Sequence, residues 1–419
     1  MNVTSGRSSG ASAAPGLRRS LKLGHAVLYG LGVTIGAGIY VLVADSAGRA
    51  GLHAPIAFLV TAVLVGLTGA SLAELGSRHP VAAGEAEYVR RGFRSERMAA
   101  AVGLLVIAMA IVSAAAISVG AAGYVRVFVR LPETLVIAAV VLAMGAVATR
   151  GIVQSVTFAG VMTLVEIGGL LIIVTAGFLY EPQVVARIPE VVPRSLDGAL
   201  WAGIMTASML AVFAFVGFEG IVNIAEEMEE PARTLPRAIF LTLGITTALY
   251  VLVMWVSLVS LGPTQLAAAK APLAAVFEKL TGGSPRVMSA IAIVATLNGI
   301  VVNLIMASRV MYGLGRSGAL PRVLSRVSET TATPVLATGV ATAIALTFAV
   351  ALPIGQLADL SARITLVVFG IVNVALVLIK RSETDPPDGL FLAPRWVPIA
   401  GALSCAVFFA ADLVIAMGK

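Results

Sequence analysis

The chain has 419 residues, of which 58% are hydrophobic and 12% charged, and its net charge is +7. Soluble proteins carry about 25% charged residues, so this composition excludes a water-soluble globule and indicates that apolar surface faces lipid. The positive charge does not indicate nucleic-acid binding, because the Lys and Arg residues lie in short loops between apolar runs, where membrane topology accounts for them. Cys405 is the single cysteine, which excludes an intrachain disulfide.

Apolar runs bounded by charged residues, Pro or Gly predict an all-α integral membrane protein with about eleven transmembrane helices. The runs fall at about 26–45, 55–78, 98–124, 134–149, 155–180, 199–228, 236–262, 286–312, 334–353, 358–380 and 396–416. The fourth run is short, and Pro353 separates the ninth run from the tenth. We expect residues 23–380 to form a ten-span core, and residues 381–419 to form a linker and one further span.

The N-terminal segment, residues 1–22, is expected to be a cytoplasmic tail. It is rich in Ser, Gly and Ala and lacks the cleavage site that a signal peptide requires. With this end inside the cell, most of the 29 Lys and Arg residues fall in inside segments, which is the bias of multi-pass proteins in the cell membrane. A short helix is expected around Leu273 to Leu280 in an outer loop. In the tenth span, Arg363 is expected to pair with Asp359, one helical turn earlier.

The first span contains four glycines within nine residues: Gly30, Gly32, Gly36 and Gly38. Each interior Gly costs a helix about 1 kcal/mol relative to Ala, so the run indicates a break in the helix. Glycines also let membrane helices pack closely. On this span alone, a broken helix and a packing face are equally good interpretations.

The sixth span favours the broken helix. Gly217 and Gly220 flank Glu219 at membrane depth, and an ionisable residue within a span is a functional candidate by default. Interrupted segments at corresponding positions of two halves indicate an inverted-repeat transporter with its site at the breaks.

The two breaks predict the chemistry of a ligand. A broken helix exposes unpaired N–H groups where its second half begins and unpaired carbonyls where its first half ends. The N–H groups suit a carboxylate, and the carbonyls suit an ammonium. A free amino acid carries both groups and is therefore the expected ligand.

Several motifs resemble those of the amino acid–polyamine–organocation permeases, in order and spacing over about residues 20–380. Residues 32–40 (GVTIGAGIY) resemble the first-span motif of these permeases, and residues 213–219 (FAFVGFE) with the following 226–239 resemble their sixth span and its loop. Residues 307–313 (ASRVMYG) and 318–321 (GALP) resemble the end of their eighth span. The resemblance implies a five-plus-five inverted-repeat fold with discontinuous first and sixth spans, and transport by alternating access.

The resemblance also implies a substrate site. The substrate carboxylate is expected at the backbone N–H groups of Gly36, Ala37 and Gly38, and the amine at the carbonyls of Thr34, Phe213 and Val216. Phe213 is expected to act as an aromatic lid, and Glu219 matches an acidic position linked to gating or proton sensitivity. The full expected set of substrate-binding residues is Thr34, Ile35, Gly36, Ala37, Gly38, Phe213, Ala214, Val216 and Gly217. Small residues from Ser113 to Ser118 of the third span suggest a neutral substrate side chain.

One departure from the family concerns coupling. Many proton-coupled members carry a Lys in the fifth span, where this chain has Glu166. A carboxylate there could bind a proton, or help hold a cation near Thr296 or Asn298 of the eighth span. Coupling to a proton, exchange, and coupling to sodium therefore all stay open.

The sequence favours a secondary active amino acid transporter, by symport or antiport, over other classes of protein. A membrane enzyme needs a reactive constellation such as HExxH, and a channel needs a continuous polar lining; the sequence has neither. A polyamine transporter and a non-transporting amino acid sensor stay open. Glu226, Glu227, Glu229 and Glu230 form a charge run without a supporting His or Asp cluster, so no metal or cofactor is expected and pairing with Arg residues is the preferred interpretation.

Overall fold

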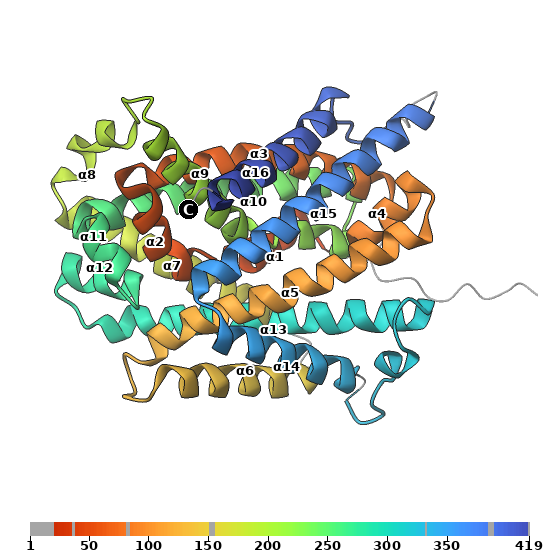
Figure 1. Ribbon diagram of the computed structural model, residues 1–419, viewed down its shortest axis with the longest axis horizontal. Coiled ribbons are helices and arrows are strands. Elements are labelled where there is room, and N and C mark those ends of the chain that lie inside the picture. The colour runs from red at the N-terminus through yellow and green to blue at the C-terminus, as the bar shows by residue number, and fades with distance from the viewer. Residues whose placement is uncertain are drawn as a thin grey trace, which may run out of the picture.

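The computed structural model describes residues 21–35, 38–80, 84–150, 156–331, 333–383 and 389–417. These residues form a bundle of helices, and α5, α6, α13 and α14 run roughly side by side along its length (Figure 1). One end of the bundle holds α4, and we call it the α4 face. The other end holds α8, α11 and α12, and we call it the α12 face.

The membrane-crossing elements follow one another in two groups. The first group consists of α1 (Leu23–Ile35), α2 (Gly38–Ala50), α3 (Ala54–Arg78), α5 (Glu96–Val125), α6 (Glu133–Thr149) and α7 (Val156–Tyr180). The second consists of α9 (Gly198–Phe215), η3 (Phe218–Glu227), α10 (Pro231–Leu261), α13 (Pro285–Ser317), α14 (Val335–Ala351) and α15 (Ile354–Ser382). The last helix, α16 (Trp396–Met417), packs against α15 and α3.

Short helices connect these elements. They are η1 (Gly51–His53), α4 (Gly84–Phe93), α8 (Gln183–Ala186), η2 (Ile188–Val191), α11 (Pro263–Ala268), α12 (Pro272–Thr281) and η4 (Arg322–Ser325). The position of α12 confirms the short helix expected around Leu273 to Leu280. Pro353 is the N-cap of α15, directly after the end of α14, and confirms the expected division of the ninth and tenth spans.

Helix length and hydropathy support the membrane assignment. Among the described residues, 8 helical stretches are long and apolar enough to cross a membrane, and α1, α6 and α14 are shorter apolar helices. One of the 8 stretches, Gly38–Arg78, joins α2 and α3. The shortness of α6, with 17 residues, agrees with the short fourth run of the sequence. A crossing helix needs about 17 to 25 residues, so α6 meets the lower limit.

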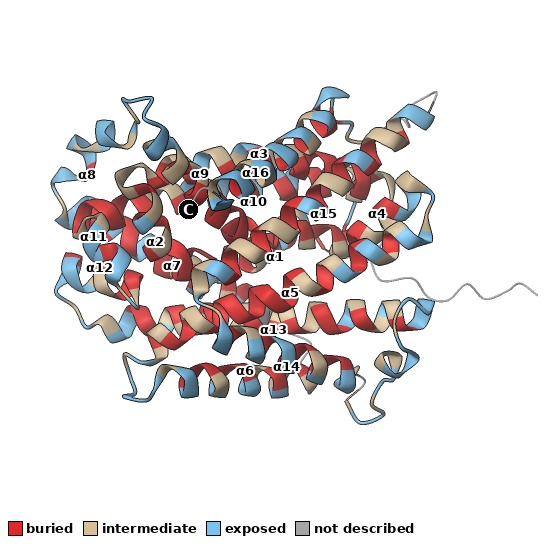
Figure 2. Ribbon diagram, in the orientation of Figure 1, coloured by how far each residue is buried: buried red, intermediate tan, exposed pale blue. Residues whose placement is uncertain are grey.

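Burial divides each helix into an inner and an outer side. Figure 2 shows buried residues where the helices meet and exposed residues along the outside of α6 and α14. Large apolar side chains such as Leu142, Val350 and Leu403 are more than a third exposed. In water such a surface would associate, whereas in a bilayer it faces lipid tails.

A buried network of charges ties three parts of the chain together near the α4 face. Glu74 is fully buried, and its Oε1 accepts a hydrogen bond from Arg78 Nη2 at 2.6 Å. Its Oε2 accepts from the backbone N–H of Ala393 at 2.8 Å and lies 2.7 Å from Lys380 Nζ. Arg78 also donates to Glu383. The network therefore fixes α3 to the end of α15 and to the segment that leads into α16.

Glu74→Gln is expected to destabilise the protein. Removing one partner of a buried ion pair costs about 3 to 5 kcal/mol, because the remaining charges lose their compensation. Thermal unfolding of purified protein should show a clear fall in melting temperature. The matched control is Glu87→Gln on α4, whose partners Arg90 and Arg91 are exposed, and it should change stability by less than about 1 kcal/mol. Equal melting temperatures for both variants would contradict the role of Glu74.

Candidate functional site at the two broken spans

The break expected in the first span falls on Gly36 and Ala37, between Ile35 and Gly38. Helix α1 ends at Ile35 and α2 begins at Gly38, while Gly36 and Ala37 lie outside the described residues. The Thr34 hydroxyl donates to the carbonyl of Gly30 at 2.7 Å, within its own helix. The side chain of Thr34 is therefore occupied locally, and its backbone carbonyl accepts a hydrogen bond from Tyr250 of α10.

The second break interrupts the sixth span after Phe215. Val216 is extended, and Gly217 has φ of +123°, a conformation that costs a residue with a Cβ considerable strain. The chain then continues as a 3-10 helix, η3, rather than as a second α-helix. The sixth span is thus interrupted at the expected position, whereas the expected break of the first span lies outside the described residues.

Glu219 caps the second break. Its Oε2 accepts a hydrogen bond from the backbone N–H of Gly217 at 2.8 Å, and its side chain is buried. This N–H would otherwise be unpaired at membrane depth, where each unsatisfied backbone group costs several kcal/mol. The acidic residue that the sequence singled out therefore contacts the backbone of its own break.

Glycines let the two breaks touch. A Cβ on Gly38 would lie 2.6 Å from the Cα of Ala214, and a Cβ on Gly217 would lie 2.5 Å from the carbonyl oxygen of Val33. Each glycine thus meets the backbone of the other broken span. These glycines therefore allow close packing between the two spans at the positions where the helices are expected to break.

Tyr250 of α10 joins the carbonyl ends of both broken helices. Its hydroxyl lies 2.9 Å from the carbonyl oxygen of Thr34 and 3.0 Å from that of Ala214. The ring is fully buried and packs edge-on against Phe58 and Phe215. Sequence reasoning missed this residue. The available signal was a lone Tyr within an apolar span, because a buried Tyr hydroxyl usually has a hydrogen-bond partner.

The backbone carbonyls expected to bind the substrate amine accept hydrogen bonds from different donors in the protein. The Phe213 carbonyl accepts from the N–H of Val216 at 3.1 Å, within the turn that ends α9. The Thr34 carbonyl faces Tyr250. A carbonyl oxygen has two lone pairs, so neither bond saturates its acceptor.

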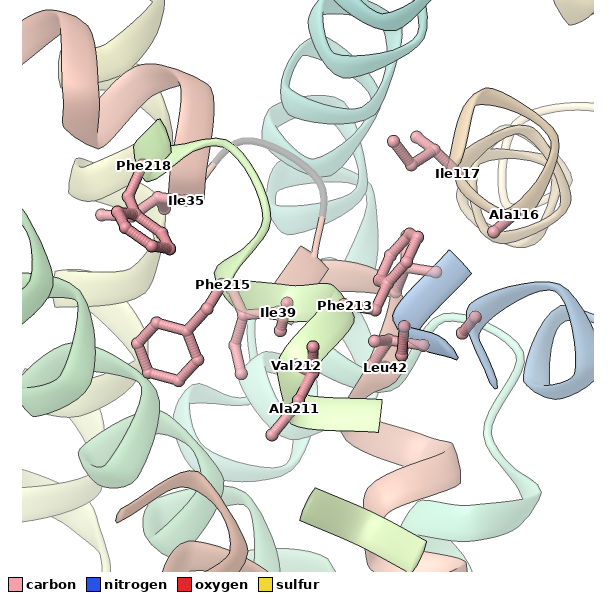
Figure 3. Close-up of a cluster of buried hydrophobic side chains, with 14 of the residues drawn as sticks. Ile35, Ile39, Leu42, Ala116, Ile117, Ala211, Val212, Phe213, Phe215 and Phe218 are labelled. Carbon is pink, nitrogen blue, oxygen red and sulfur yellow. The ribbon is translucent and has the colours of Figure 1, made fainter. Parts of the chain in front are cut away.

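Apolar side chains surround the breaks on the side of α5. Figure 3 shows Phe213 turned toward Ile117 of α5, whereas Phe215 points to the opposite side of α9. Phe213 is buried, 4% exposed. Ser113 and Ser118, at the ends of the small-residue segment of α5, bond to Ser361 and to the carbonyl of Ala114. The wall near Phe213 is therefore apolar.

Glu166 of α7 and Asn298 of α13 are brought together as expected. Asn298 Nδ2 donates to Glu166 Oε1 at 3.2 Å, and Tyr40 of α2 donates to the backbone carbonyl of Glu166 at 2.6 Å. Among the described residues, the other carboxylate oxygen, Oε2, is buried without a hydrogen-bond partner. The Thr296 hydroxyl donates to the carbonyl of Ala292 in its own helix. The pair links α7 to α13 and, through Tyr40, to the first broken span.

The expected pairing of Arg363 with Asp359 is wrong. Arg363 Nε lies 2.6 Å from Asp412 of α16, and Asp359 receives two hydrogen bonds from Arg49 of α2, at 2.8 and 2.9 Å. Arg49 also donates to the carbonyl of Thr206 at 3.1 Å. Arg49 binds Asp359 in a two-pronged geometry, which strengthens an Arg–carboxylate contact, and Arg363 pairs with Asp412 of the neighbouring helix instead.

The α4-face ends of the two broken spans are also joined. The N–H of Leu21 donates to the carbonyl of Glu227, and the N–H of Glu229 donates to the carbonyl of Leu21, both at 2.9 Å. Of the expected Glu–Arg pairs in this charge run, Glu230 and Arg233 approach to 3.5 Å on the surface. These backbone bonds hold the end of η3 against the segment that leads into α1.

Comparisons with known proteins agree with this architecture. A sequence model described as "Amino acid permease" matches residues 22–418. An uncharacterized transporter of Mycobacterium tuberculosis is 32% identical over 397 residues, which cover 93% of this chain and 86% of that protein. The branched-chain amino acid permease BcaP of Bacillus subtilis is 28% identical over 429 residues, which cover 96% of this chain and 89% of that permease. The vacuolar cationic amino acid transporter 2 of Arabidopsis thaliana is 28% identical over 396 residues, which cover 89% of this chain and 61% of that transporter.

An all-α bundle of long apolar helices is the architecture of a multi-pass membrane protein. The chain belongs to the amino acid permease family, within the amino acid–polyamine–organocation superfamily. This confirms the resemblance found in the motifs and the expected fold class. The relatives are named as transporters and permeases, in agreement with a protein that is not an enzyme.

Gly38→Ala is expected to abolish transport while leaving membrane insertion intact. The new Cβ would meet the Cα and carbonyl oxygen of Ala214 at 2.6 and 2.9 Å, and this backbone cannot move aside without separating the two breaks. Overpacking of this kind costs about 1 to 3 kcal/mol. The matched control is Gly244→Ala on α10, where a Cβ meets nothing within 4 Å. Uptake and expression of both variants are measured in vesicles. Wild-type uptake by Gly38→Ala would contradict the close contact.

Proposed function

We propose that the protein is a secondary active transporter that carries neutral, apolar amino acids by alternating access. The observation that carries this proposal is the meeting of the Thr34 and Ala214 carbonyls at one Tyr250 hydroxyl. A hydroxyl donates one hydrogen, so one of the two carbonyls always has an acceptor to spare for an ammonium. The first N–H groups of α2 supply the complementary donors for a carboxylate.

The substrate side chain is proposed to be apolar. Ile39, Leu42, Ala116, Ile117 and Phe213 gather beside the breaks and carry no charge (Figure 3). The Bacillus relative is named a branched-chain amino acid permease, whereas the Arabidopsis relative is named a cationic amino acid transporter. The carboxylate closest to the breaks, Glu219, is engaged with Gly217. These contacts favour a neutral side chain over a cationic amino acid or a polyamine.

Glu166 is proposed to couple substrate transport to the binding of a proton or a cation. Its unpartnered Oε2 is buried beside Asn298, and an unpaired buried charge is so costly that the group must bind a proton or a cation. Its link through Tyr40 to α2 connects this site to the substrate break. We favour a proton-coupled transporter or an exchanger, with sodium coupling as the alternative.

The orientation is proposed from charge. Arg78, Arg91 and Arg94 lie in or beside α4, and basic residues concentrate on the cytoplasmic side of membrane proteins. We therefore place the α4 face and the N-terminus in the cytoplasm, the α12 face outside, and the protein in the cell membrane.

A thermal-shift screen followed by vesicle uptake tests the substrate class. L-Leucine, L-isoleucine and L-valine are expected to raise the melting temperature of the purified protein, because a ligand that binds only the folded state stabilises it. L-Lysine, L-arginine and putrescine are expected to have no effect. Labelled L-leucine should then enter vesicles and exchange with unlabelled L-leucine inside. A thermal shift without any uptake or exchange would favour a sensor over a transporter.

Glu166→Gln is expected to change the dependence of L-leucine uptake on pH, because Gln keeps the size of the side chain but cannot exchange a proton. Uptake is measured between pH 5 and 8, with and without sodium. The control is Glu278→Gln, an exposed carboxylate of α12, which should leave the profile unaltered. An unaltered profile for Glu166→Gln in both sodium conditions would remove Glu166 from coupling.

A further inference from the structure

A cavity of about 250 Å³ opens on the α12 face, apart from the breaks. Its wall comes from the second half of the first span (α2), the end of α5 and the segment between α11 and α12. Pockets for drug-sized ligands measure about 300 to 1,000 Å³, so this cavity suits a smaller molecule. A free amino acid is of that size.

The floor of the cavity lies beside the substrate break. Tyr40, two residues after Gly38, lines it together with Tyr124. The Tyr124 hydroxyl donates to the backbone carbonyl of Tyr40, and the Tyr40 hydroxyl donates to the backbone of Glu166. Asp45, which also lines the cavity, lies about two turns of α2 from its start at Gly38.

Three charged side chains line the cavity: Glu133, which pairs with Arg126, and two opposite charges that have no partner among the described residues. Asp45 of α2 and Lys270, between α11 and α12, both line it. Throughout the described residues, neither side chain takes part in a hydrogen bond or an ion pair. Asp45 is half-buried, and its charged neighbours are Arg49, Asp359 and Lys270. Arg49 and Asp359 already bond to each other, so the carboxylate of Asp45 and the ammonium of Lys270 are left to bind something else.

The mouth of the cavity is basic. A wider hollow of about 630 Å³ adjoins it, shares Gly123 and Lys270 with it, and is lined by Arg126 and Arg130. Arg126 pairs with Glu133 at 2.9 Å, whereas Arg130 is exposed and has no ion pair within the described part of the chain. A concave surface of one charge sign concentrates ligands of the opposite sign. Lys270 and Arg130, the cations of this mouth that have no ion pair among the described residues, therefore attract a carboxylate.

We propose that this cavity is an entry site for the transported amino acid, which binds Asp45 through its ammonium group and Lys270 through its carboxylate before it moves to the breaks. The proposal rests on the function proposed above and narrows the substrate class to molecules with both groups. A polyamine lacks the carboxylate that Lys270 and the basic mouth select. The site belongs to one face only, since its lining residues all lie on the α12 face.

Transport of L-leucine in both directions tests the entry site. Asp45→Asn and Lys270→Gln are each compared with wild type for entry from the α12 face and for exit from preloaded cells or vesicles. Each variant is expected to raise KM from the α12 face by about three- to fivefold, because the loss of one partly exposed ion pair weakens binding by about that factor. KM from the α4 face and the maximal rate of entry should stay within twofold of wild type. The maximal rate of exit should fall in the same proportion as KM from the α12 face rises, because the ratio of maximal rate to KM must change equally in both directions.

Two charge-matched controls lie on the same face but outside the cavity. Lys279→Gln and Glu278→Gln change exposed residues of α12, and both should leave KM unaltered from either face. A rise in KM for the cavity variants on the α12 face alone supports the entry site. Unaltered KM, or an equal rise from both faces, overturns it.

The design separates this site from the proposed function. Wild-type protein that moves no L-leucine would contradict the proposed function, and the entry site with it. Wild-type uptake with cavity variants that behave like the α12 controls would contradict the entry site alone. Variants with a lower maximal rate of entry and an unaltered KM from the α12 face would assign Asp45 and Lys270 to a later step and also overturn the proposal.

Discussion

Backbone polar groups cannot be left unpaired inside a bilayer, and two spans of this protein break their helices there. Each unsatisfied group in the hydrocarbon costs several kcal/mol, so the breaks can persist only where other parts of the protein supply partners. Tyr250 supplies a donor for the carbonyls of Thr34 and Ala214, and Glu219 supplies an acceptor for the N–H of Gly217. Much of the core is arranged to make these few bonds possible.

The same requirement explains where the polar side chains of the spans lie. Glu74 sits among two cations and a backbone N–H, and its network holds three distant segments together near the α4 face. Arg49 and Asp359 join α2 to α15 toward the α12 face. Glu166 differs, because one of its oxygens is satisfied by Asn298 and the other has no partner among the described residues. A fully paired charge stabilises the fold, whereas a half-paired one is left able to bind an ion.

The two faces of the protein differ in what joins the broken spans. On the α4 face, backbone hydrogen bonds connect Leu21 to Glu227 and Glu229. Toward the α12 face, the side chain of Arg49 in α2 donates to the Thr206 carbonyl of α9 and also pairs with Asp359 of α15. A cavity lined by Asp45 opens on this face, and Asp45 has no ion pair among the described residues. For the broken spans to separate at one face, the contacts on that face must break while those on the other face are kept. That asymmetry is what alternating access would need.

The sequence by itself determined the class of the protein and the location of its breaks. Hydropathy fixes the spans because helix length must match the bilayer, and the glycines around Gly38 and Gly217 mark the breaks because a helix tolerates few of them. It also named Thr296 and Asn298 as candidate neighbours of a cation near Glu166, and the structure brings Asn298 to this carboxylate while the Thr296 hydroxyl bonds within its own helix. Only the tertiary structure decided the partners that come from distant segments. The local prediction for Arg363 was wrong because Asp412, far along the chain, packs closer. Tyr250 looked like any core aromatic until the fold brought its hydroxyl to both breaks, and Asp45 became notable only when α12 and its preceding loop closed a cavity around it. Span positions follow from local composition, whereas these contacts depend on how the helices pack.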